Sequence, residues 1–390
     1  MNIVAILGRQ PELSLAELEG RFGADALRPF SPDAALVEAA DFDVQRFGGV
    51  QKAGRVIAEL DPAPWDRLSR DLVQRYARQL TGDGKLTLGI SVYGSRDVDA
   101  RAVGRTGLAL KQALKKRGRS VRLVPNDGPA LSTATSHHNK LGLSDNKLEI
   151  MVIYGPDSVI IADSIGSQNI SALAARDQGR PKRDAFVGML PPKLALMMIN
   201  MSGAVTTDDA KTCILDPFCG TGVVLQEAAL LGFDVYGTDL SEKMVDYSRA
   251  NLDWLAVKHP VGLVRIEAGD AIEHTWQPPV DAVVAETYLG QPFSAPPAPD
   301  KLEKVLKTVD IIITKFLQNL HGQLEPGTPL CLAVPAWRSA TNWFTYLPVI
   351  KKLESLGYEW QQLTSVDATK LTYYREDQVV ARHLLLLTRR

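Results

Sequence analysis

The segment Cys213-Ile-Leu-Asp-Pro-Phe-Cys-Gly-Thr-Gly222 carries the strongest fold signal in the C-terminal half of the chain. Apolar residues lead into an acid and a turn with two glycines, and an apolar helical pattern follows over 223–231. Because Gly220 and Gly222 carry no Cβ, the backbone can approach a ligand closely at this turn. The helix behind the turn presents free N–H groups and the positive end of its dipole. Strand, glycine turn and helix in this order predict a nucleoside-binding α/β unit.

The residues that follow extend this pattern. From Lys193 onward, short apolar runs alternate with helical patterns, which is typical of a parallel sheet with helices on both faces. The fold class is therefore α/β, with a Rossmann-type domain and a seven-stranded, mostly parallel sheet. Five strands are predicted at 213–216, 235–238, 263–267, 281–285 and 330–334, and an antiparallel hairpin at 361–366 and 379–387 should close the sheet edge.

Acidic residues stand at the ends of the first three predicted strands. Asp216 ends the first strand, where open α/β sheets bind ligands. Asp239 ends the second strand, about 20 residues beyond the glycine turn, and can accept hydrogen bonds from both ribose hydroxyls. Asp270 follows the third strand and could accept the amino hydrogens of adenine. Asp239 and Asp270 could instead be helix caps or loop acids, but three correctly ordered strand ends favour the binding role.

The glycine turn differs from a dinucleotide-binding fingerprint. That fingerprint needs G-x-G-x-x-G, and Leu225 occupies the place of the third glycine. The sequence D-P-F-C-G-T-G instead resembles the S-adenosylmethionine motif of RNA and DNA amino-methyltransferases. S-adenosylmethionine is therefore the expected cofactor. The expected cofactor-binding residues in these turns are Asp216, Phe218, Gly220, Thr221, Gly222, Asp239, Leu240, Asp270 and Ala271.

The N-terminal half carries a second α/β pattern, with strands predicted at 3–7, 86–93, 121–124, 148–154 and 158–163. Ser14 and Glu17 have capping-box spacing, which predicts a helix that begins at Ser14. A connector over 174–192 contains Arg180-Pro181 and should cross the surface in extended form. We expect an N-terminal region over 1–60, a second module over 61–172, a linker over 173–192 and the Rossmann-type domain over 193–390.

A positively charged block lies in the second module, on a predicted helix over 99–117 and the residues after it. Eight basic residues and no acid fall between positions 101 and 122. Such a block attracts phosphates through Coulomb forces and the release of counterions. On charge alone, a helix face that is merely solvated is an equally good interpretation. The residues are Arg101, Arg105, Lys111, Lys115, Lys116, Arg117, Arg119 and Arg122.

Composition limits the class of protein. The chain has 390 residues, a formal net charge of −1 and 45% hydrophobic residues. These values suit two or three soluble globular domains and argue against an indiscriminate nucleic-acid binder. No apolar run approaches the ~18–20 residues of a membrane span. The start meets Gly8-Arg9 too soon for a signal peptide, so we expect a cytoplasmic protein without membrane contact.

Several other side chains belong to types that can carry chemistry. The three cysteines have no zinc spacing, and the adjacent His137 and His138 chelate a metal poorly, so we expect no metal site. The histidine pair should lie in a loop that faces RNA or solvent, and Cys219 should be a small packing residue. Core packing is the default for the cluster Trp337, Trp343 and Phe344. Residues 373–375, Tyr-Tyr-Arg, could face the substrate pocket.

Together these segments resemble a known family, the THUMP-domain tRNA guanosine-N2 methyltransferases that act on tRNA position ten. The similar stretches are Leu7-Gly-Arg-Gln-Pro-Glu-Leu-Ser-Leu-Ala-Glu-Leu18 and the run from Arg180-Pro181 through Met189-Leu-Pro-Pro-Lys-Leu-Ala195 to Ile199-Asn200. The resemblance implies a ferredoxin-like N-terminal piece, a THUMP module, a linker and a methyltransferase domain. It adds Pro192 and Lys193 to the residues beside the cofactor. A THUMP module that binds the tRNA acceptor end would use the basic block.

The chain departs from the family at its catalytic motif. The family has D-P-P-Y after the fourth strand, where the acid and a proline carbonyl accept hydrogen bonds from an exocyclic amine and the ring stacks on the base. The equivalent stretch here is Glu286-Thr-Tyr-Leu-Gly-Gln-Pro-Phe293. The expected catalytic residues are Glu286, which keeps a carboxylate, and Tyr288, with Phe293 as the other aromatic candidate. The double proline is missing.

The leading interpretation is an S-adenosylmethionine-dependent RNA methyltransferase that modifies an exocyclic amine of a tRNA guanine. A DNA amino-methyltransferase shares the glycine turn but would need a target-recognition domain. An inactive RNA-binding protein that retains the cofactor is favoured only by the altered segment after Glu286. The sequence leaves open the exact base, mono- or dimethylation, a small activating protein subunit and the oligomeric state.

Overall fold

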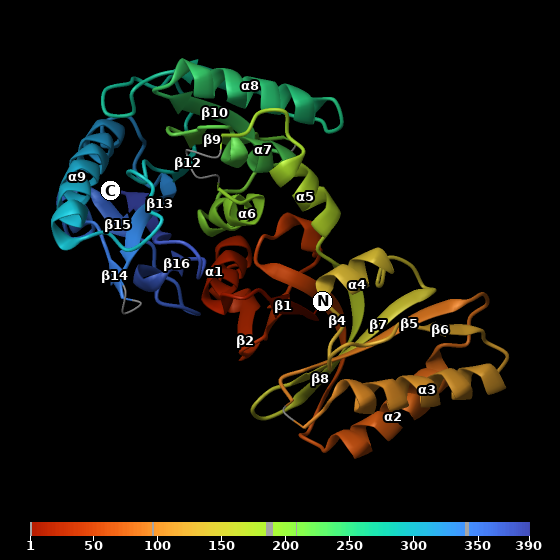
Figure 1. Cartoon of the computed structure of the whole chain (residues 1–390). Coiled ribbons are helices and arrows are strands. Elements are labelled where there is room, and N and C mark those ends of the chain that lie inside the picture. The colour runs from red at the N-terminus through yellow and green to blue at the C-terminus, as the bar shows by residue number, and fades with distance from the viewer. Residues whose placement is uncertain (1, 96, 185–189, 208, 340–342) are drawn as a thin grey trace. The chain divides into compact units, whose positions relative to one another are not determined.

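A computed structural model of the chain (Figure 1) describes residues 2–95, 97–184, 190–207, 209–339 and 343–390. The chain divides into two compact units. The first consists of Met1–Leu15 and Phe22–Ala172, and the second of Ala16–Arg21 and Leu173–Arg390. No helix in the described part of the chain is long and apolar enough to cross a membrane.

The first unit is built on one eight-stranded sheet in the order β2-β3-β1-β4-β8-β7-β5-β6. β5 pairs in parallel with β6 and β7, and the other neighbours are antiparallel. Because β4 pairs with both β1 and β8, the sheet continues across the predicted boundary at residue 60. The strands are β1 (Asn2–Leu7), β2 (Leu27–Ser31), β3 (Ala34–Glu38), β4 (Val50–Leu60), β5 (Leu86–Tyr93), β6 (Val121–Leu123), β7 (Lys147–Tyr154) and β8 (Val159–Ser167).

Two helices cover part of this sheet, α2 (Trp65–Gln79) and α3 (Ala100–Lys116). Their apolar sides share one core with β5, β7 and β8, and their charged sides face outward. Asp99 caps α3 by accepting a hydrogen bond from the N–H of Ala102 at 2.7 Å, which fixes the start of the basic helix.

A buried ion pair holds the short helix α4 (Thr133–His138) in the first unit. Lys52 Nζ lies 2.5 Å from Glu149 Oε1, and Ser136 of α4 donates to Glu149 Oε2 at 2.6 Å. Such a buried charge must be paired, because an unpaired one is strongly destabilising. His137 and His138 occupy the last turn of α4, so the prediction of a loop at these residues was wrong.

The second unit has a nine-stranded sheet. Seven strands follow the order β11-β10-β9-β12-β13-β17-β15, and two short strands pair at the side, β14 with β13 and β16 with β17. From β11 to β13 all neighbours are parallel, and β17 is antiparallel to β13 and β15. The strands are β9 (Cys213–Asp216), β10 (Asp234–Asp239), β11 (Val264–Ala268), β12 (Ala282–Glu286), β13 (Pro329–Arg338), β14 (Phe344–Thr345), β15 (Tyr358–Trp360), β16 (Thr372–Tyr373) and β17 (Val380–Arg389).

Most helices of the second unit pack against this sheet (Figure 1). α9 contributes Ile313, Phe316 and Leu320 to a core shared with β9, β12 and β13. Trp337 belongs to the same core, as expected, whereas Trp343 is 78% exposed and does not. The helices are α5 (Ile170–Gln178), α6 (Pro192–Met201), α7 (Val223–Leu230), α8 (Glu242–Ala256) and α9 (Pro299–His321).

The chain order places a switch point between β9 and β12. The chain runs outward from β9 to β10 and β11 on one side, and then continues to β12 and β13 on the other. In open α/β sheets, ligands bind at the carboxyl ends of the strands that flank such a reversal. The ends of β9 and β12 are Asp216 and Glu286.

Three local predictions were wrong. Residues 361–366 form no strand, and β17 instead pairs with the preceding Tyr358–Trp360. The start of the 174–192 connector is helical in α5 rather than extended. The first helix, α1 (Pro11–Phe22), begins three residues before Ser14, because proline fits the first helical turn without losing a hydrogen bond.

Six residues of α1 belong to the second unit, Ala16–Arg21. Glu17 accepts a hydrogen bond from Asn200 Nδ2 at 3.0 Å, where Asn200 lies on α6. Glu19 accepts from the backbone N–H groups of Thr364 and Ser365 at 2.5 and 2.8 Å. Both carboxylates are buried, so this segment is part of the packed interior of the second unit.

Candidate cofactor and catalytic site

The glycine turn and Asp239 form one hydrogen-bonded arrangement. Gly220 donates its backbone N–H to Asp239 Oδ2 at 2.9 Å, and Ser241 donates to Oδ1 at 2.9 Å. Gly220 has φ +52°, and a Cβ built there would meet nothing closer than Phe218 O at 3.8 Å, so glycine leaves open space at this point. The turn therefore exposes bare backbone beside a fixed carboxylate, which is what a nucleoside ligand requires.

A second glycine of the turn serves packing. Gly222 has φ +78°, and a Cβ there would lie 2.9 Å from Ser248 Oγ on α8. Ser248 in turn donates to the carbonyl of Gly220 at 2.8 Å. Cys219 is 4% exposed, which confirms its prediction as a packing residue. The turn is thus held against α8.

Asp270 follows β11 beside Asp239. Gly269 donates its N–H to the carbonyl of Asp239 at 3.0 Å, and Asp270 Oδ1 accepts from the N–H of Ile272 at 3.1 Å. The strand ends of β10 and β11 are therefore next to each other, and the local bond fixes the Asp270 side chain.

Other residues expected at the cofactor occupy different surroundings. Phe218 packs edge-on against Phe316, with ring centroids 4.9 Å apart, and Ala271 is buried. Thr221 is also largely buried, whereas Leu240 is 73% exposed. Pro192 is buried at the start of α6, and Lys193 beside it is exposed.

Asp216, Asp239 and Glu286 end three neighbouring strands, β9, β10 and β12. Burial raises the pKa of Asp216 well above its ordinary value, and the negative charges of Asp239 and Glu286 raise it further. Burial also raises the pKa of Asp239. A positively charged ligand would favour the ionised form of all three groups.

Glu286 has a partner that sequence reasoning missed. Arg382 of β17 donates from Nε to Glu286 Oε1 at 2.8 Å, and both side chains are largely buried. Burial raises the pKa of Glu286, and the charge and hydrogen bond of Arg382 oppose that rise. Tyr288, the expected stacking residue, is exposed two positions later.

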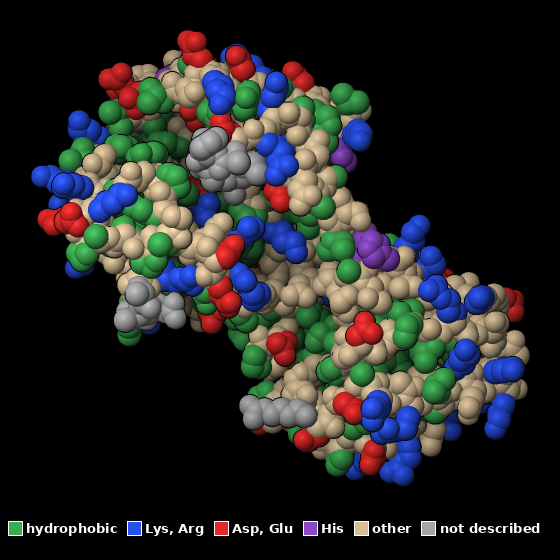
Figure 2. Space-filling view, in the orientation of Figure 1, with side chains coloured by type: hydrophobic (Ala, Val, Ile, Leu, Met, Phe, Trp, Pro, Cys, Tyr) green, Lys and Arg blue, Asp and Glu red, His purple; other side chains and the backbone are tan. Residues whose placement is uncertain are grey.

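A basic face covers α2 and α3 of the first unit. Arg101, Arg105, Lys115, Lys116 and Arg117 are exposed, as is Arg122, and Lys111 is half-buried. Figure 2 shows Lys and Arg side chains gathered over these helices. Arg119 differs, because its guanidinium is buried and donates to Asn146 Oδ1 at 2.7 Å. We therefore exclude Arg119 from this face.

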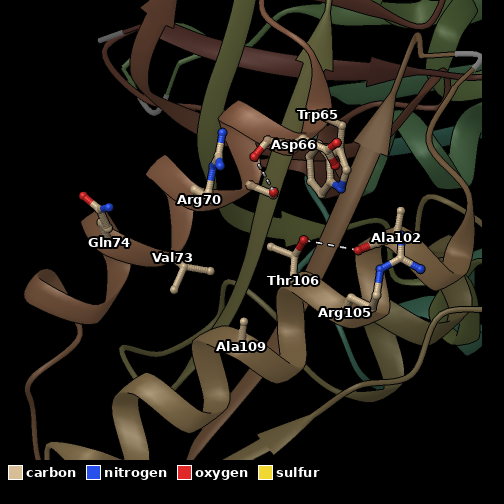
Figure 3. Close-up of a pocket in the computed structure, with 10 residues that line it drawn as sticks. Trp65, Asp66, Arg70, Val73, Gln74, Ala102, Arg105, Thr106 and Ala109 are labelled. Atoms are coloured by element: carbon tan, nitrogen blue, oxygen red, sulfur yellow. Dashed lines mark hydrogen bonds between the residues drawn. The ribbon is translucent and has the colours of Figure 1, made fainter.

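Sequence reasoning also missed the arginines that α2 adds to this positively charged surface. A groove of about 380 Å³ lies between α2 and α3, and Arg70 of α2 and Arg105 of α3 both line it (Figure 3). Arg67 and Arg78 are further exposed cations on α2. Their signal was weak because Asp66 and Asp71 stand among them in the sequence. From here the name basic face means the exposed and half-buried Lys and Arg residues of α2, α3 and Arg122.

The second unit matches proteins of known class. Residues 180–309 match a family described as UPF0020, RMKL-like, methyltransferase domain. The second unit contains a methyltransferase domain. We refer to the second unit from here as the methyltransferase unit.

The chain is also similar to a curated relative. That relative is the tRNA (guanine(10)-N2)-dimethyltransferase of Methanothermobacter thermautotrophicus, which is 35% identical over 161 residues. The match covers 41% of this chain and 43% of the relative, so the chain spans less than half the length of that protein.

Two solved structures resemble the whole chain. TrmN from Thermus thermophilus has a TM-score of 0.55 at 18% identity and covers 100% of this chain and 99% of its own. A possible methylase from Clostridium difficile 630 has a TM-score of 0.52 at 14% identity and covers 98% and 97%. At these identities the likeness supports the α/β fold alone.

The residues around the start of the matched domain are hydrogen-bonded to the two helices that flank the glycine turn. The guanidinium of Arg176 donates two hydrogen bonds to the carboxylate of Glu227 on α7, at 2.6 and 2.9 Å. Asn251 of α8 donates to the carbonyls of Lys182 and Thr221, each at 2.9 Å. The only sequence signal for these contacts was the placement of polar residues within otherwise apolar helical patterns. These contacts hold α5 against α7 and Lys182 against α8.

The methyltransferase unit should lose stability in mild acid because of His383. This side chain is 2% exposed, and burial lowers its pKa to about 4. The unfolded histidine takes up a proton near pH 6.5, whereas the folded one stays neutral until about pH 4. Stability is therefore present above pH 6.5 and declines as the pH falls toward 4. We expect His383 to remove about 2 kcal/mol of unfolding free energy between pH 7 and pH 5.

Urea unfolding at pH 7 and pH 5 checks this expectation. The variant His383→Gln cannot titrate in this range, so its stability should change less between the two pH values than that of the parent. Acids with a raised pKa, such as Glu286, change stability in the opposite direction in both proteins and cancel in the comparison. Equal changes in parent and variant would contradict a neutral buried His383.

Proposed function

We propose that the protein is an S-adenosylmethionine-dependent methyltransferase that transfers a methyl group to the N2 amine of a guanine in tRNA. The observation that carries this proposal is the pairing of two features at one switch point. Asp239 fixes the glycine turn through Gly220, and Glu286 ends the strand on the other side of Asp216. A cofactor subsite at Asp239 and an amine acceptor at Glu286 would thus share one sheet edge.

The residues present fit S-adenosylmethionine. Asp239 would accept hydrogen bonds from the ribose hydroxyls, and Asp270 would accept from the adenine amine. The open space at Gly220 admits the ligand against the backbone. Asp216 and Asp239, when ionised, would stabilise the positive charge of its sulfonium. When bound, this cofactor supplies an electrophilic methyl group.

Glu286 has the chemistry to prepare the amine. Its carboxylate would accept a hydrogen bond from the amine and orient the nitrogen lone pair toward the methyl carbon. The bound cofactor would supply the methyl group to this lone pair, with its sulfur as the leaving group. The methylated nitrogen then loses one proton to Glu286 or to water. Tyr288 would stack on the base and keep the amine in place.

The choice of tRNA rests on the relative and on charge. The relative is named a tRNA (guanine(10)-N2)-dimethyltransferase. The basic face is a surface that a phosphate backbone would bind through Coulomb attraction and counterion release. The basic face has the four arginines of α2 and few acids, although the whole chain has a net charge of −1. We also propose a cytoplasmic location, where Cys213, Cys219 and Cys331 would stay reduced.

Methyl transfer from labelled cofactor to bulk tRNA, followed by nucleoside analysis of the product, tests the function. Labelled N2-methylguanosine or N2,N2-dimethylguanosine is the expected product. A different methylated nucleoside would overturn the guanine-N2 assignment, and transfer to DNA alone would favour a DNA amino-methyltransferase. If the cofactor binds but nothing is methylated, an RNA-binding protein that retains the cofactor becomes the better explanation.

Charge reversal on the basic face should weaken tRNA binding. The triple variant Lys115→Glu, Lys116→Glu, Arg117→Glu and the groove variant Arg70→Glu, Arg105→Glu should both reduce affinity. Each should lower the slope of log Kd against log salt by roughly one for each phosphate that the variant no longer binds. Cofactor affinity should be unchanged.

Binding assays at several salt concentrations measure this slope. A matched control is Lys351→Glu with Lys352→Glu, two exposed lysines in the methyltransferase unit. If a basic-face variant keeps the parent slope, its residues are a solvated surface and bind no phosphate.

A further inference from the structure

Glu286 is held by a buried arginine of another strand, Arg382 of β17. We propose that Arg382 is a positioning residue that anchors Glu286 and replaces the rigid double-proline turn that this chain lacks. The proposal rests on methyl transfer at Glu286. Arg382 acts through Glu286 and does not itself contact the substrate.

The register of the sheet explains how Arg382 reaches Glu286 across an intervening strand. Glu286 of β12 lies opposite Ala333 of β13, and Arg382 of β17 lies opposite Pro335. Positions 333 and 335 are two apart, so all four side chains are on one face of the sheet. Ala333 and Pro335 are small and leave room above β13. The arginine side chain can therefore cross to the tip of β12.

The residue after Glu286 provides a second restraint. Thr287 occupies the place of the first proline in D-P-P-Y, and its backbone N–H donates to the carbonyl of Ala333 at 3.0 Å. A proline has no N–H and could not make this bond. Thr287 Oγ1 donates to the same carbonyl at 3.3 Å. The chain beyond Glu286 is thus fixed by pairing with β13 instead of by proline rings.

The ion pair uses only one of the two carboxylate oxygens. Arg382 binds Oε1, and within the described part of the chain Glu286 Oε2 makes no hydrogen bond. Arg382 is itself steadied by Gln378, whose Oε1 accepts from Nη1 at 3.3 Å. One oxygen is therefore anchored, and the other is available to an amine.

The charge of Arg382 matters as much as its position. Glutamate has one more methylene than aspartate, so its carboxylate needs an external partner to be held in one place. Arg382 also stabilises the ionised form of a buried carboxyl, and only the ionised form has both oxygens as acceptors. Without Arg382, the pKa of Glu286 would rise further and less of the acceptor would be present at neutral pH.

Kinetics as a function of pH tests this proposal in the full-length protein. Arg382→Gln should lower kcat at pH 7 by about 10- to 100-fold and recover activity as the pH rises. KM values for tRNA and cofactor should change little. Arg382→Lys keeps the charge but lacks the planar fork, so it should keep the parent pH profile with a smaller loss of kcat. The control Arg389→Gln changes an arginine seven residues along the same strand.

A double variant and an NMR titration distinguish loss of the ion pair from misfolding and from an inactive parent protein. The double variant Glu286→Gln, Arg382→Gln removes both charges, so it should be more stable than Arg382→Gln, but it should not recover activity at high pH. Carbon-13 NMR titration of labelled glutamate should show a higher pKa for Glu286 in Arg382→Gln than in the parent, whether or not the parent is active. An active parent and an Arg382→Gln variant with the same pH profile, or an unchanged Glu286 titration, would overturn the proposal. An inactive parent with a shifted Glu286 titration would count against the methyltransferase function and not against the ion pair.

Discussion

Replacing Glu286 with glutamine is expected to lower kcat for methyl transfer to tRNA by about 10²–10³-fold. The amide keeps the size of the side chain but can place an N–H donor where the amine needs an acceptor. It also removes the negative charge that pairs with Arg382. Single-turnover transfer of labelled methyl groups gives the rate directly. Cofactor and tRNA affinities should remain close to those of the parent.

A control variant and a variant of the stacking residue test whether the loss of activity is specific to the proposed site. Glu325→Gln changes an exposed glutamate of the same unit and should keep parent activity. Tyr288→Ala should lower activity by a smaller amount, because base stacking of about 1–3 kcal/mol is removed. Full activity in Glu286→Gln would place the acceptor elsewhere and refute the assignment of this strand end.

Replacing Asp239 with alanine is expected to weaken S-adenosylmethionine binding by about 10- to 150-fold, which corresponds to ~1.5–3 kcal/mol for hydrogen bonds to a charged group. The carboxylate is proposed to bind the ribose hydroxyls. It also accepts from Gly220 and Ser241, so its loss loosens the turn as well. Titration calorimetry measures the affinity.

A conservative variant of Asp239 and a control at a nearby acid test whether the loss of affinity comes from the Asp239 carboxylate. Asp239→Asn keeps one oxygen acceptor and should lose less affinity than the alanine variant. Asp253→Ala removes an exposed acid from the neighbouring helix α8 and should leave binding unchanged. Parent-like affinity in Asp239→Ala would remove the ribose role from the end of β10.

The sequence predicts much of the methyltransferase unit, because its decisive signals are local. The glycine turn after an apolar strand identifies β9, and the alternation that follows places β10, β11, β12 and β13 close to where they occur. Asp239 and Asp270 could be predicted as neighbours because parallel strands bring their carboxyl ends to one edge. Gly220 and Asp239 are indeed hydrogen-bonded.

The features that sequence reasoning missed depend on pairing between distant segments. Arg382 lies 96 positions from Glu286, and a lone arginine in an apolar strand gives no indication of its partner. The predicted hairpin failed because β15 is only three residues long, too short for a periodic pattern, and lies just before the stretch 361–366. Arg119 looks like its exposed neighbours in the sequence, and only its hydrogen bond to Asn146 sets it apart.

The assignment of Ala16–Arg21 to the second unit bears on any attempt to divide the protein. A fragment that starts at the linker would lack Glu17 and Glu19. It would leave Asn200 and the N–H groups of Thr364 and Ser365 without these acceptors. Such a fragment would also lack Ala16 and Leu18, two buried apolar residues of the same segment. Supplying the α1 sequence as a separate peptide, or joining it to the fragment by a new linker, would restore those acceptors. A fragment of the methyltransferase unit therefore needs Ala16–Arg21 as well as Leu173–Arg390.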